Sequence, residues 1–340
     1  NQEKDRLVAI AAAELELPTM PATALAADAN PLFARGRQRA FVKVQDGCRY
    51  RCAFCIVTLA RGEERSRPLP EVVAEINRAT AEGVREVVLA GVHLGGWGSD
   101  LGQGLDDLVA GVLAETDIPR LRLGSLEPWE LPERLWELFA NPRLMPHLHL
   151  PLQSGADTVL RRMARRCRTG EFAHLAAQAR ERVPGINLTT DLIVGFPGES
   201  EDEWRQTLDF VRRIGFGQIH IFPYSPRPGT KAATLPDPVP AAVKLARSQA
   251  LHELARRLKG ETLDRRLGME TTILVEGRHG GDSAGDWFGY TPDYLPARLT
   301  ATGTPDLTNH LLRVRLIGRH TDGESLVAML IAPQAASPVR

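Results

Sequence analysis

The chain has 340 residues, a length that fits one large domain plus a small one better than a single compact unit. Its 42 basic and 42 acidic residues give a formal net charge of zero, which confines any nucleic-acid surface to local patches. No apolar run approaches the ~18 residues that a membrane helix requires. These features exclude a membrane-spanning protein and a polyanion binder of uniformly basic surface, and we expect a soluble cytoplasmic protein.

At the amino end, "NQEKDRLVAIAAAE" (1–14) predicts a helix that enters from an earlier part of a protein, and the chain starts without Met. We therefore interpret the chain as a fragment. Basic residues are frequent in 35–67, and "RRMARRCR" (161–168) contains five arginines in eight positions. Both stretches are compatible with RNA binding, but charge alone favours a solvated, salt-bridged face.

Short strand-like runs alternate with helical stretches between residues 40 and 225. The predicted strands are 40–45, 86–92, 120–126, 147–153, 186–196 and 218–225. The predicted helices are 70–82, 104–115, 131–140, 156–182 and 201–214. This alternation indicates parallel strands joined by right-handed crossovers, in an open doubly wound sheet or a partial barrel. Both architectures place functional residues at the carboxyl ends of the strands.

A different organisation follows residue 225. A proline-rich segment (223–240) precedes a predicted helix at 241–267, and closely spaced short strands with glycine turns then predict a small all-β barrel. In that barrel Tyr290 and Tyr294 accompany three arginines, as in proteins that bind single-stranded RNA: Arg313, Arg315 and Arg319. Arginines that are merely solvated at alternate strand positions explain the composition equally well.

Three of the four cysteines, Cys48, Cys52 and Cys55, lie within eight positions, directly after the first predicted strand. Structural zinc usually takes four protein ligands, in two pairs, and here the second pair is missing. A cubane 4Fe-4S cluster held by three cysteines instead keeps one iron open for a substrate or cofactor. The spacing therefore favours a catalytic cluster. Cys167 is isolated among arginines, and we interpret it as a passive residue.

The segment "KVQDGCRYRCAFCIV" followed by "RGEERSRP" resembles the signature loop of the radical S-adenosylmethionine (SAM) superfamily, in its methylthiotransferase branch. Further similar segments occur in that branch's order at 83–100, 120–128, 147–165, 189–204 and 222–230. The resemblance is strongest to the members that thiomethylate threonylcarbamoyladenosine beside the anticodon of tRNA. Sister members act on isopentenyladenosine in tRNA or on an aspartate of a ribosomal protein.

The resemblance implies a domain organisation. It predicts an α/β fold, a partial (β/α)6 TIM-like radical SAM barrel, followed by a small all-β TRAM barrel that binds RNA. The implied parts are a remnant of an N-terminal domain and linker (1–36), the radical SAM core (37–230), a linker and connecting helix (231–267), the TRAM barrel (268–333) and a tail (334–340).

The resemblance also implies roles for individual residues. Cys48, Cys52 and Cys55 would hold a 4Fe-4S cluster whose open iron binds SAM, and reductive cleavage of SAM would give a 5'-deoxyadenosyl radical. Phe54 would flank the adenine, and the backbone of Ala90 and Gly91 would receive the methionine amino group. The remaining implied residues are Ser125, Glu127, Gln153 and Asp191 at cofactor or substrate, and Arg313, Arg315 and Arg319 at RNA phosphates.

The implied partners are tRNA, an electron donor such as a flavodoxin or ferredoxin, and a sulfur donor. Methylthiotransferases carry a second 4Fe-4S cluster on three further cysteines of an N-terminal domain, and this chain has none of those cysteines. We interpret the difference as a truncation. Two other classes stay open: an RNA-binding protein with structural zinc on the three cysteines and a histidine, and a radical enzyme that inserts no sulfur.

Overall fold

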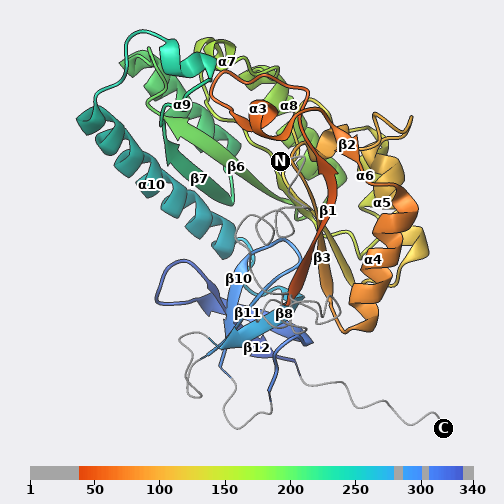
Figure 1. Ribbon diagram of the computed structural model, residues 1–340. Helices are drawn as coiled ribbons and strands as arrows, with labels where there is room; N and C mark the ends of the chain where they lie inside the picture. Colours follow the sequence, from red (N-terminus) through yellow and green to blue (C-terminus); the bar gives the residue numbers. More distant parts are fainter. Residues whose placement is uncertain (1–37, 279–285, 301–305, 332–340) are drawn as a thin grey trace, which may run out of the picture.

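The structure is a computed structural model that describes residues 38–278, 286–300 and 306–331 (Figure 1). The expected amino-terminal helix, the proposed domain remnant (1–36) and the tail (334–340) lie outside the described residues. None of the helices that the structure describes combines the length and the apolar character needed to cross a membrane.

Two sheets form a curved half-barrel. In the first, β1 (Arg39–Asp46), β3 (Glu86–Gly91) and β4 (Arg120–Leu123) are parallel, and the short β2 (Arg65–Ser66) pairs antiparallel with β1 at the edge. In the second, β5 (His147–His149), β6 (Asn187–Val194) and β7 (Gln218–Pro223) are parallel. Single bridges, including Ser125 with His149, join the two sheets between β4 and β5. The predicted partial α/β barrel is confirmed.

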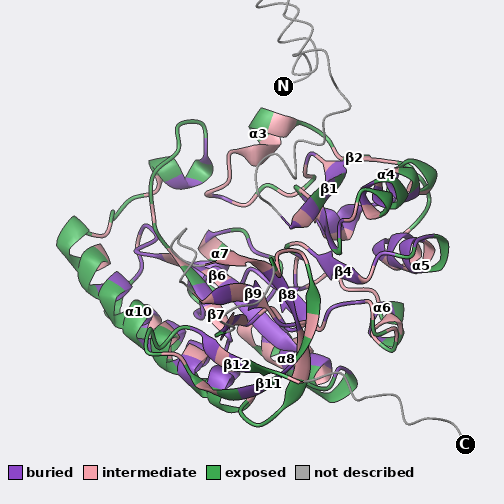
Figure 2. Ribbon diagram, turned by 90° about the horizontal axis from the view of Figure 1, so that it is seen from below, coloured by how far each residue is buried: buried purple, intermediate pink, exposed green. Residues whose placement is uncertain are grey.

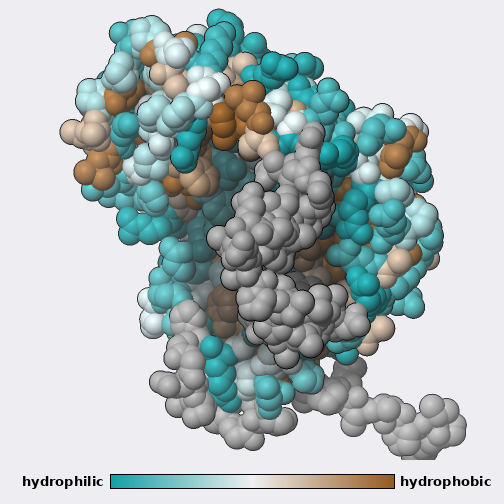
Figure 3. All heavy atoms as spheres, in the orientation of Figure 1, coloured by the Kyte–Doolittle hydropathy of each residue, from teal (hydrophilic) through white to brown (hydrophobic). Residues whose placement is uncertain are grey.

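Helices cover the outer face of this half-barrel, as Figure 1 shows: α4 (Leu69–Ala81), α5 (Leu105–Glu115), α6 (Arg134–Leu138), α7 (Asp157–Arg162), α8 (Thr169–Arg182) and α9 (Glu201–Ile214). The helices bury one side and expose the other (Figure 2). In α9 the buried residues Trp204, Thr207, Val211 and Ile214 recur at helical spacing, and the Ser200 hydroxyl caps the first turn. Figure 3 shows that the described surface in this view is mostly hydrophilic, with apolar residues in small groups.

The predicted helix at 156–182 is wrong as one continuous element, because α7 ends at Arg162 and α8 begins at Thr169. Ala164 adopts a left-handed conformation (φ 57°), which stops α7. The amide of Arg165 then donates to the carbonyl of Leu160. The alternating pattern of strands and helices also did not predict four short elements. They are α3 (Val57–Arg61), β2 and the two 3-10 turns at Leu94–Gly96 and Lys231–Thr234.

Beyond the half-barrel, α10 (Ala241–Asp264) leads into a closed barrel. Its strands are β8 (Glu270–Arg278), β9 (Trp287–Tyr290), β10 (Pro296–Leu299), β11 (Leu311–Arg319) and β12 (Leu326–Leu330). The barrel order is β10-β12-β11-β8-β9, and the barrel has a separate apolar core around Ile273, Val275, Trp287, Val314 and Leu316. The predicted small all-β barrel is confirmed.

The small barrel packs against the amino ends of the half-barrel strands (Figure 1). At this junction the fully buried carboxylate of Glu86 pairs with Arg122 at 2.9 Å and with Arg120 at 3.5 Å. Arg120 also donates to the carbonyls of Thr272 and Tyr290. The barrel therefore closes the end of the half-barrel opposite to the loop that carries the three cysteines.

Tyr290 and Tyr294 belong to this junction. Their rings stack at 4.8 Å between centroids, and the guanidinium of Arg39 lies over both rings. The structure thus separates the two tyrosines from the arginines of β11, with which the sequence grouped them.

Candidate active site

The three clustered cysteines lie in the loop between β1 and α3. The loop starts at Gly47, which has a φ of 78° and whose hypothetical Cβ would lie 1.9 Å from the Glu63 carbonyl oxygen, so only glycine fits. Ala53 fixes its middle, because the Ala53 amide donates to Met163 and the Ala53 carbonyl accepts from the Ala232 amide. Cys48, Cys52 and Cys55 stay partly exposed, whereas Cys167 is buried. Three of the four thiols are therefore accessible in this loop, and the fourth, that of Cys167, lies in the core.

Arg165 supplies a positive charge beside this loop. Its Nη1 lies 3.8 Å from the sulfur of Cys52, its Nη2 lies 2.7 Å from a carboxylate oxygen of Glu127, and its guanidinium lies over the ring of Trp129. The side chain is only 2% exposed, so the interpretation of 161–168 as a solvated face is wrong at this position.

The thiols fit a sulfur-liganded metal group. Burial raises the pKa of the Cys48 thiol to about 11 and also raises the pKa of Cys52, while the charge of Arg165 opposes the shift at Cys52. Coordination to a metal deprotonates such thiols outright, and a buried guanidinium beside them compensates part of the thiolate charge. Three partly exposed sulfur donors with one adjacent cation are a suitable ligand set for an iron–sulfur cluster.

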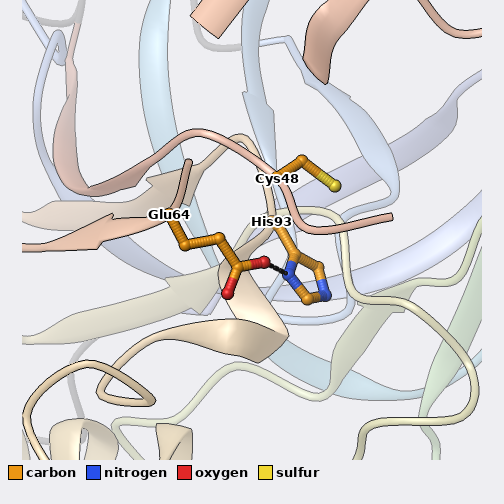
Figure 4. Close-up of side chains that lie close together, drawn as sticks. All are labelled: Cys48, Glu64 and His93. Atoms are coloured by element: carbon orange, nitrogen blue, oxygen red, sulfur yellow. Dashed lines mark hydrogen bonds and ion pairs between the residues drawn. The ribbon is translucent and has the colours of Figure 1, made fainter. Parts of the chain in front are cut away.

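Glu64, Glu130 and His93 form a hydrogen-bond network beside Cys48, and Figure 4 shows Glu64 and His93 of this network. The Nδ1 of His93 meets Glu64, and its Nε2 meets Glu130, which also accepts from Tyr50 and Arg49. The Cys48 sulfur and ligand atoms of Glu64 and His93 all lie within 4.8 Å of one another. Although burial opposes it, pairing with the two carboxylates raises the pKa of His93. Both ring nitrogens of His93 are therefore directed at carboxylates.

Several of the residues that the sequence singled out lie at the carboxyl ends of the strands. Ala90 and Gly91 end β3, and Gly91 packs closely against the side chain of Gln45. Gln153 has a positive φ of 75°, although its amide donates to Asp191 and its carbonyl accepts from the Ile193 amide. Non-glycine residues seldom adopt this conformation, and the bridge to Leu192 of β6 holds Gln153 in it.

The other residues singled out at this edge lie as follows. Glu127 pairs with Arg165, and Ser125 bridges to His149. Phe54 packs against a small apolar cluster that includes Phe196 of the "GFPGE" turn. In that turn Gly195 and Gly198 both have positive φ values, of 73° and 71°. The structure therefore brings Phe54 and the glycine turn to the same side of the cysteine loop.

The three arginines proposed to contact RNA lie elsewhere, on one face of β11. Arg313, Arg315 and Arg319 are 65%, 51% and 41% exposed. Exposed residues recur at alternate positions along β11 and include all three arginines, although the pairing register shifts between Leu316 and Gly318, before Arg319. Glu270 lies 2.6 Å from Arg315 and 3.5 Å from Arg313, so part of this positive charge is compensated.

A cavity of about 450 Å3 fills the interior of the half-barrel, and we call it the lumen cavity. Its lining is Phe41, Val88, Arg122, Leu123, Gly124, Ser125, His147, His149, Thr189, Asp191, Gln218, His220, Phe222, Tyr290 and Tyr294. Ser125, Asp191, Tyr290 and Tyr294 were singled out from the sequence, whereas the histidines of this cavity were not, and neither were Arg165, His93 and Glu130. The alternate polar residues of "HLH" (147–149) and "QIH" (218–220) could have indicated these histidines, since alternate positions share one face of a strand.

Similarity to known proteins agrees with this geometry. Residues 42–211, half of the chain, match the Radical SAM superfamily. The chain is 41% identical over 283 residues to the tRNA-2-methylthio-N(6)-dimethylallyladenosine synthase of Chloroflexus aurantiacus, covering 81% of this chain and 59% of the relative. It is 38% identical over 242 residues to the threonylcarbamoyladenosine tRNA methylthiotransferase of Thermotoga maritima, covering 71% of this chain and 56% of the relative.

The corresponding enzyme of Bacillus subtilis is 35% identical over 288 residues, covering 83% of this chain and 63% of the relative. The chain thus spans about three fifths of the length of these curated relatives. Because the superfamily match covers half of the chain and includes the cysteine loop and the strands β3 to β6, the chain belongs to the radical SAM superfamily.

Proposed function

We propose that this chain is the radical SAM part of a tRNA methylthiotransferase that adds a methylthio group to threonylcarbamoyladenosine beside the anticodon. The observation that carries the proposal is the three-cysteine loop at the carboxyl edge of the half-barrel, in a chain whose relatives are named tRNA methylthiotransferases. Isopentenyladenosine in tRNA and an aspartate of a ribosomal protein are the alternative substrates of the same chemistry.

Cys48, Cys52 and Cys55 would hold a 4Fe-4S cluster, and the open iron would bind the amino and carboxylate groups of SAM. The bound cluster would supply the electron that cleaves SAM reductively to methionine and a 5'-deoxyadenosyl radical. The protein contributes position and electrostatics. Arg165 holds a fixed positive charge beside Cys52, and Glu127 holds Arg165 in place.

The remaining residues at this edge would orient SAM. Phe54 presents an aromatic ring next to the last cysteine ligand, where it would flank the adenine. The backbone of Ala90 and Gly91 would receive the methionine amino group, and the side chains of Ser125 and Gln153 would contact SAM or substrate. The accessibility of the strand ends and the unusual backbone of Gln153 support this assignment.

The domain boundaries that we propose are 37–230 for the radical SAM core, 231–267 for the linker and 268–333 for a TRAM barrel. Arg313, Arg315 and Arg319 would contact tRNA phosphates from the exposed face of β11. The other partners would be a sulfur donor and an electron donor such as a flavodoxin or ferredoxin. The protein would act in the cytoplasm.

The test is anaerobic reconstitution of the chain with iron and sulfide, followed by incubation with SAM and dithionite and chromatography for 5'-deoxyadenosine. We expect about four irons per chain and formation of 5'-deoxyadenosine. A protein that binds zinc, assembles no cluster and leaves SAM intact would instead support the alternative of a zinc-containing RNA-binding protein. Product mass on tRNA, with the full-length protein, then distinguishes methylthiolation from a radical reaction without sulfur insertion.

A further inference from the structure

The lumen cavity contains a cluster of three polar side chains, which we call the lumen triad: His149, Asp191 and His220. Their ligand atoms all lie within 4.8 Å of one another. They come from the three strands of the second sheet, one residue each from β5, β6 and β7, and face the same cavity. No described residue of the cysteine loop lines this cavity, so the triad is separate from the proposed cluster ligands.

Hydrogen bonds fix one side of the lumen triad. The Nε2 of His149 lies 3.1 Å from Asp191 Oδ1, and the Nδ1 of His149 lies 2.9 Å from the Thr189 hydroxyl. The same hydroxyl lies 3.0 Å from Nε2 of the buried His147. These contacts orient the His149 ring and the Asp191 carboxylate before any ligand arrives.

The rest of the cavity lining keeps unused hydrogen-bonding capacity. Among the residues that the structure describes, no side-chain hydrogen bond involves Ser125, Gln218 or the exposed His220. An imidazole, an amide and a hydroxyl that face a cavity without partners favour a ligand with several polar groups, because an apolar ligand would desolvate them without compensation.

Aromatic rings stand at the two open edges of the cavity. Phe41 on β1 and Phe222 on β7, the first and last of the parallel strands, are each 51% exposed. Exposed aromatic faces are the usual platforms for unstacked bases. The cavity volume of about 450 Å3 lies in the range of small-molecule sites, so a flipped nucleoside fits its size.

The cavity also lies close to the proposed site of radical formation. Val88 lines the cavity two residues before Ala90 on the same face of β3, a separation of about 7 Å along a strand. A base bound in the lumen cavity would therefore lie next to the SAM that Ala90 and Gly91 are proposed to hold.

We propose that the lumen triad binds the polar substituent of threonylcarbamoyladenosine and thereby selects this base over one that carries a dimethylallyl group. This inference rests on the proposed function, because it assigns the specificity of the same site. The threonylcarbamoyl substituent offers N–H groups that donate to Asp191, and a hydroxyl and a carboxylate that accept from the imidazole of His220. His149, whose two ring nitrogens already contact Asp191 and Thr189, orients the Asp191 carboxylate. A dimethylallyl group satisfies none of these side chains, and a site built for hydrogen bonding rejects an analogue that lacks the partner groups.

The test uses the reconstituted full chain and three anticodon stem-loop RNAs of one sequence, whose adenosine beside the anticodon is unmodified, threonylcarbamoylated or dimethylallylated. Dissociation constants are measured at one salt concentration. We expect the wild-type chain to prefer the threonylcarbamoylated RNA over the dimethylallylated RNA by about tenfold or more, the discrimination that one or two hydrogen bonds to a charged group provide. His220→Phe should weaken the first complex, strengthen the second and leave binding of the unmodified RNA unchanged.

The matched control is His174→Phe on the exposed face of α8, which should keep the wild-type preference. His149→Phe and Asp191→Asn should each reduce the preference as well. Equal affinity of the wild-type chain for the two modified RNAs, or an unchanged preference in folded His220→Phe, would overturn the inference.

Formation of 5'-deoxyadenosine from SAM is measured in the same preparations. If the chain cleaves SAM but shows no preference, the inference fails and the proposed function stands. If the chain prefers the threonylcarbamoylated RNA but cleaves no SAM, the proposed function fails, while recognition of the threonylcarbamoyl group by the lumen triad stands. Retained SAM cleavage by His220→Phe also shows that this variant is folded.

Discussion

Arg165 places a guanidinium nitrogen 3.8 Å from the sulfur of Cys52, while its other terminal nitrogen pairs with Glu127 at 2.7 Å. A buried cation at this position stabilises negative charge on the sulfur ligands. One-electron reduction of a thiolate-bound cluster adds a further negative charge, so the guanidinium favours the reduced form.

Arg165→Gln should therefore lower the midpoint potential of the cluster, by an amount on the order of tens of millivolts, and slow the formation of 5'-deoxyadenosine. Arg165→Lys, which keeps the charge, should retain most of the potential. Arg161→Gln on the exposed face of α7 is the control. Spectroelectrochemical titration provides the readout, and an unchanged potential in Arg165→Gln would contradict the assigned role.

Each of the three loop cysteines should be essential for the cluster. Cys48→Ala, Cys52→Ala and Cys55→Ala should each abolish the visible iron–sulfur absorbance and SAM cleavage, because each removes one thiolate ligand. Cys167→Ala should retain both, at a cost of about 1 kcal/mol in stability because its side chain is buried. A complete cubane in Cys52→Ala would show that the ligands are misassigned.

The exposed face of β11 should contribute salt-dependent binding of tRNA. Arg315→Gln should weaken binding and reduce the slope of log K against log salt by about 0.7–0.9, the amount expected for one phosphate contact. Glu270→Gln should strengthen binding, because Glu270 pairs with Arg315 at 2.6 Å and competes with the phosphates. Arg212→Gln on α9, 54% exposed, is the matched control. Equal slopes for Arg315→Gln and wild type would remove this face from the RNA interface.

Glu203 should make stability depend on pH in the acid range. Burial alone would raise its pKa, but hydrogen bonds from Arg162, Thr158 and the Ser200 amide lower the pKa of Glu203 to about 2, from an ordinary value of 4.5. Because the folded pKa is depressed, the stabilisation is complete above pH 4.5 and is lost as the pH falls toward 2.

Glu203→Gln should therefore lower the free energy of unfolding by about 1 kcal/mol at pH 7, as expected for loss of a cap and an ion pair. The difference in the free energy of unfolding between Glu203→Gln and wild type should be smaller at pH 3 than at pH 7. Asp202→Asn, at a side chain that is 83% exposed, should have little effect at either pH. Urea unfolding at both pH values measures this, and a constant difference would exclude Glu203 as the titrating group.

The junction of the two barrels should depend on Glu86. Its carboxylate is fully buried and pairs with Arg120 and Arg122, with Arg39 at 3.9 Å. Glu86→Gln leaves these cations without their counter-ion, so we expect a loss of about 3–5 kcal/mol in stability. Glu276→Gln, at a side chain that is 25% exposed, should cost less. Thermal unfolding of the two variants compares their stabilities. An equal loss of stability in both would mean that burial of Glu86 does not make its ion pairs more important than that of Glu276.

The sequence by itself determined the parts that depend on local pattern. Apolar periodicity located the six parallel strands of the half-barrel and most helices within a few residues, and the spacing of Cys48, Cys52 and Cys55 indicated the kind of ligand set. These properties are encoded over short distances along the chain, because strand and helix patterns repeat every two to four residues. The roles of the individual site residues and the domain boundaries stay predictions.

Only the tertiary structure decided which distant side chains meet. His149, Asp191 and His220 are separated by 42 and 29 positions in the sequence, and they meet because parallel pairing aligns β5, β6 and β7 in one register. Likewise, Arg165 lies in an arginine-rich stretch that predicts a solvated face, yet a left-handed Ala164 breaks the helix and Arg165 is buried beside Cys52. Local charge could not predict this burial, because the compensating partners, Glu127 and Cys52, come from other strand ends of the half-barrel.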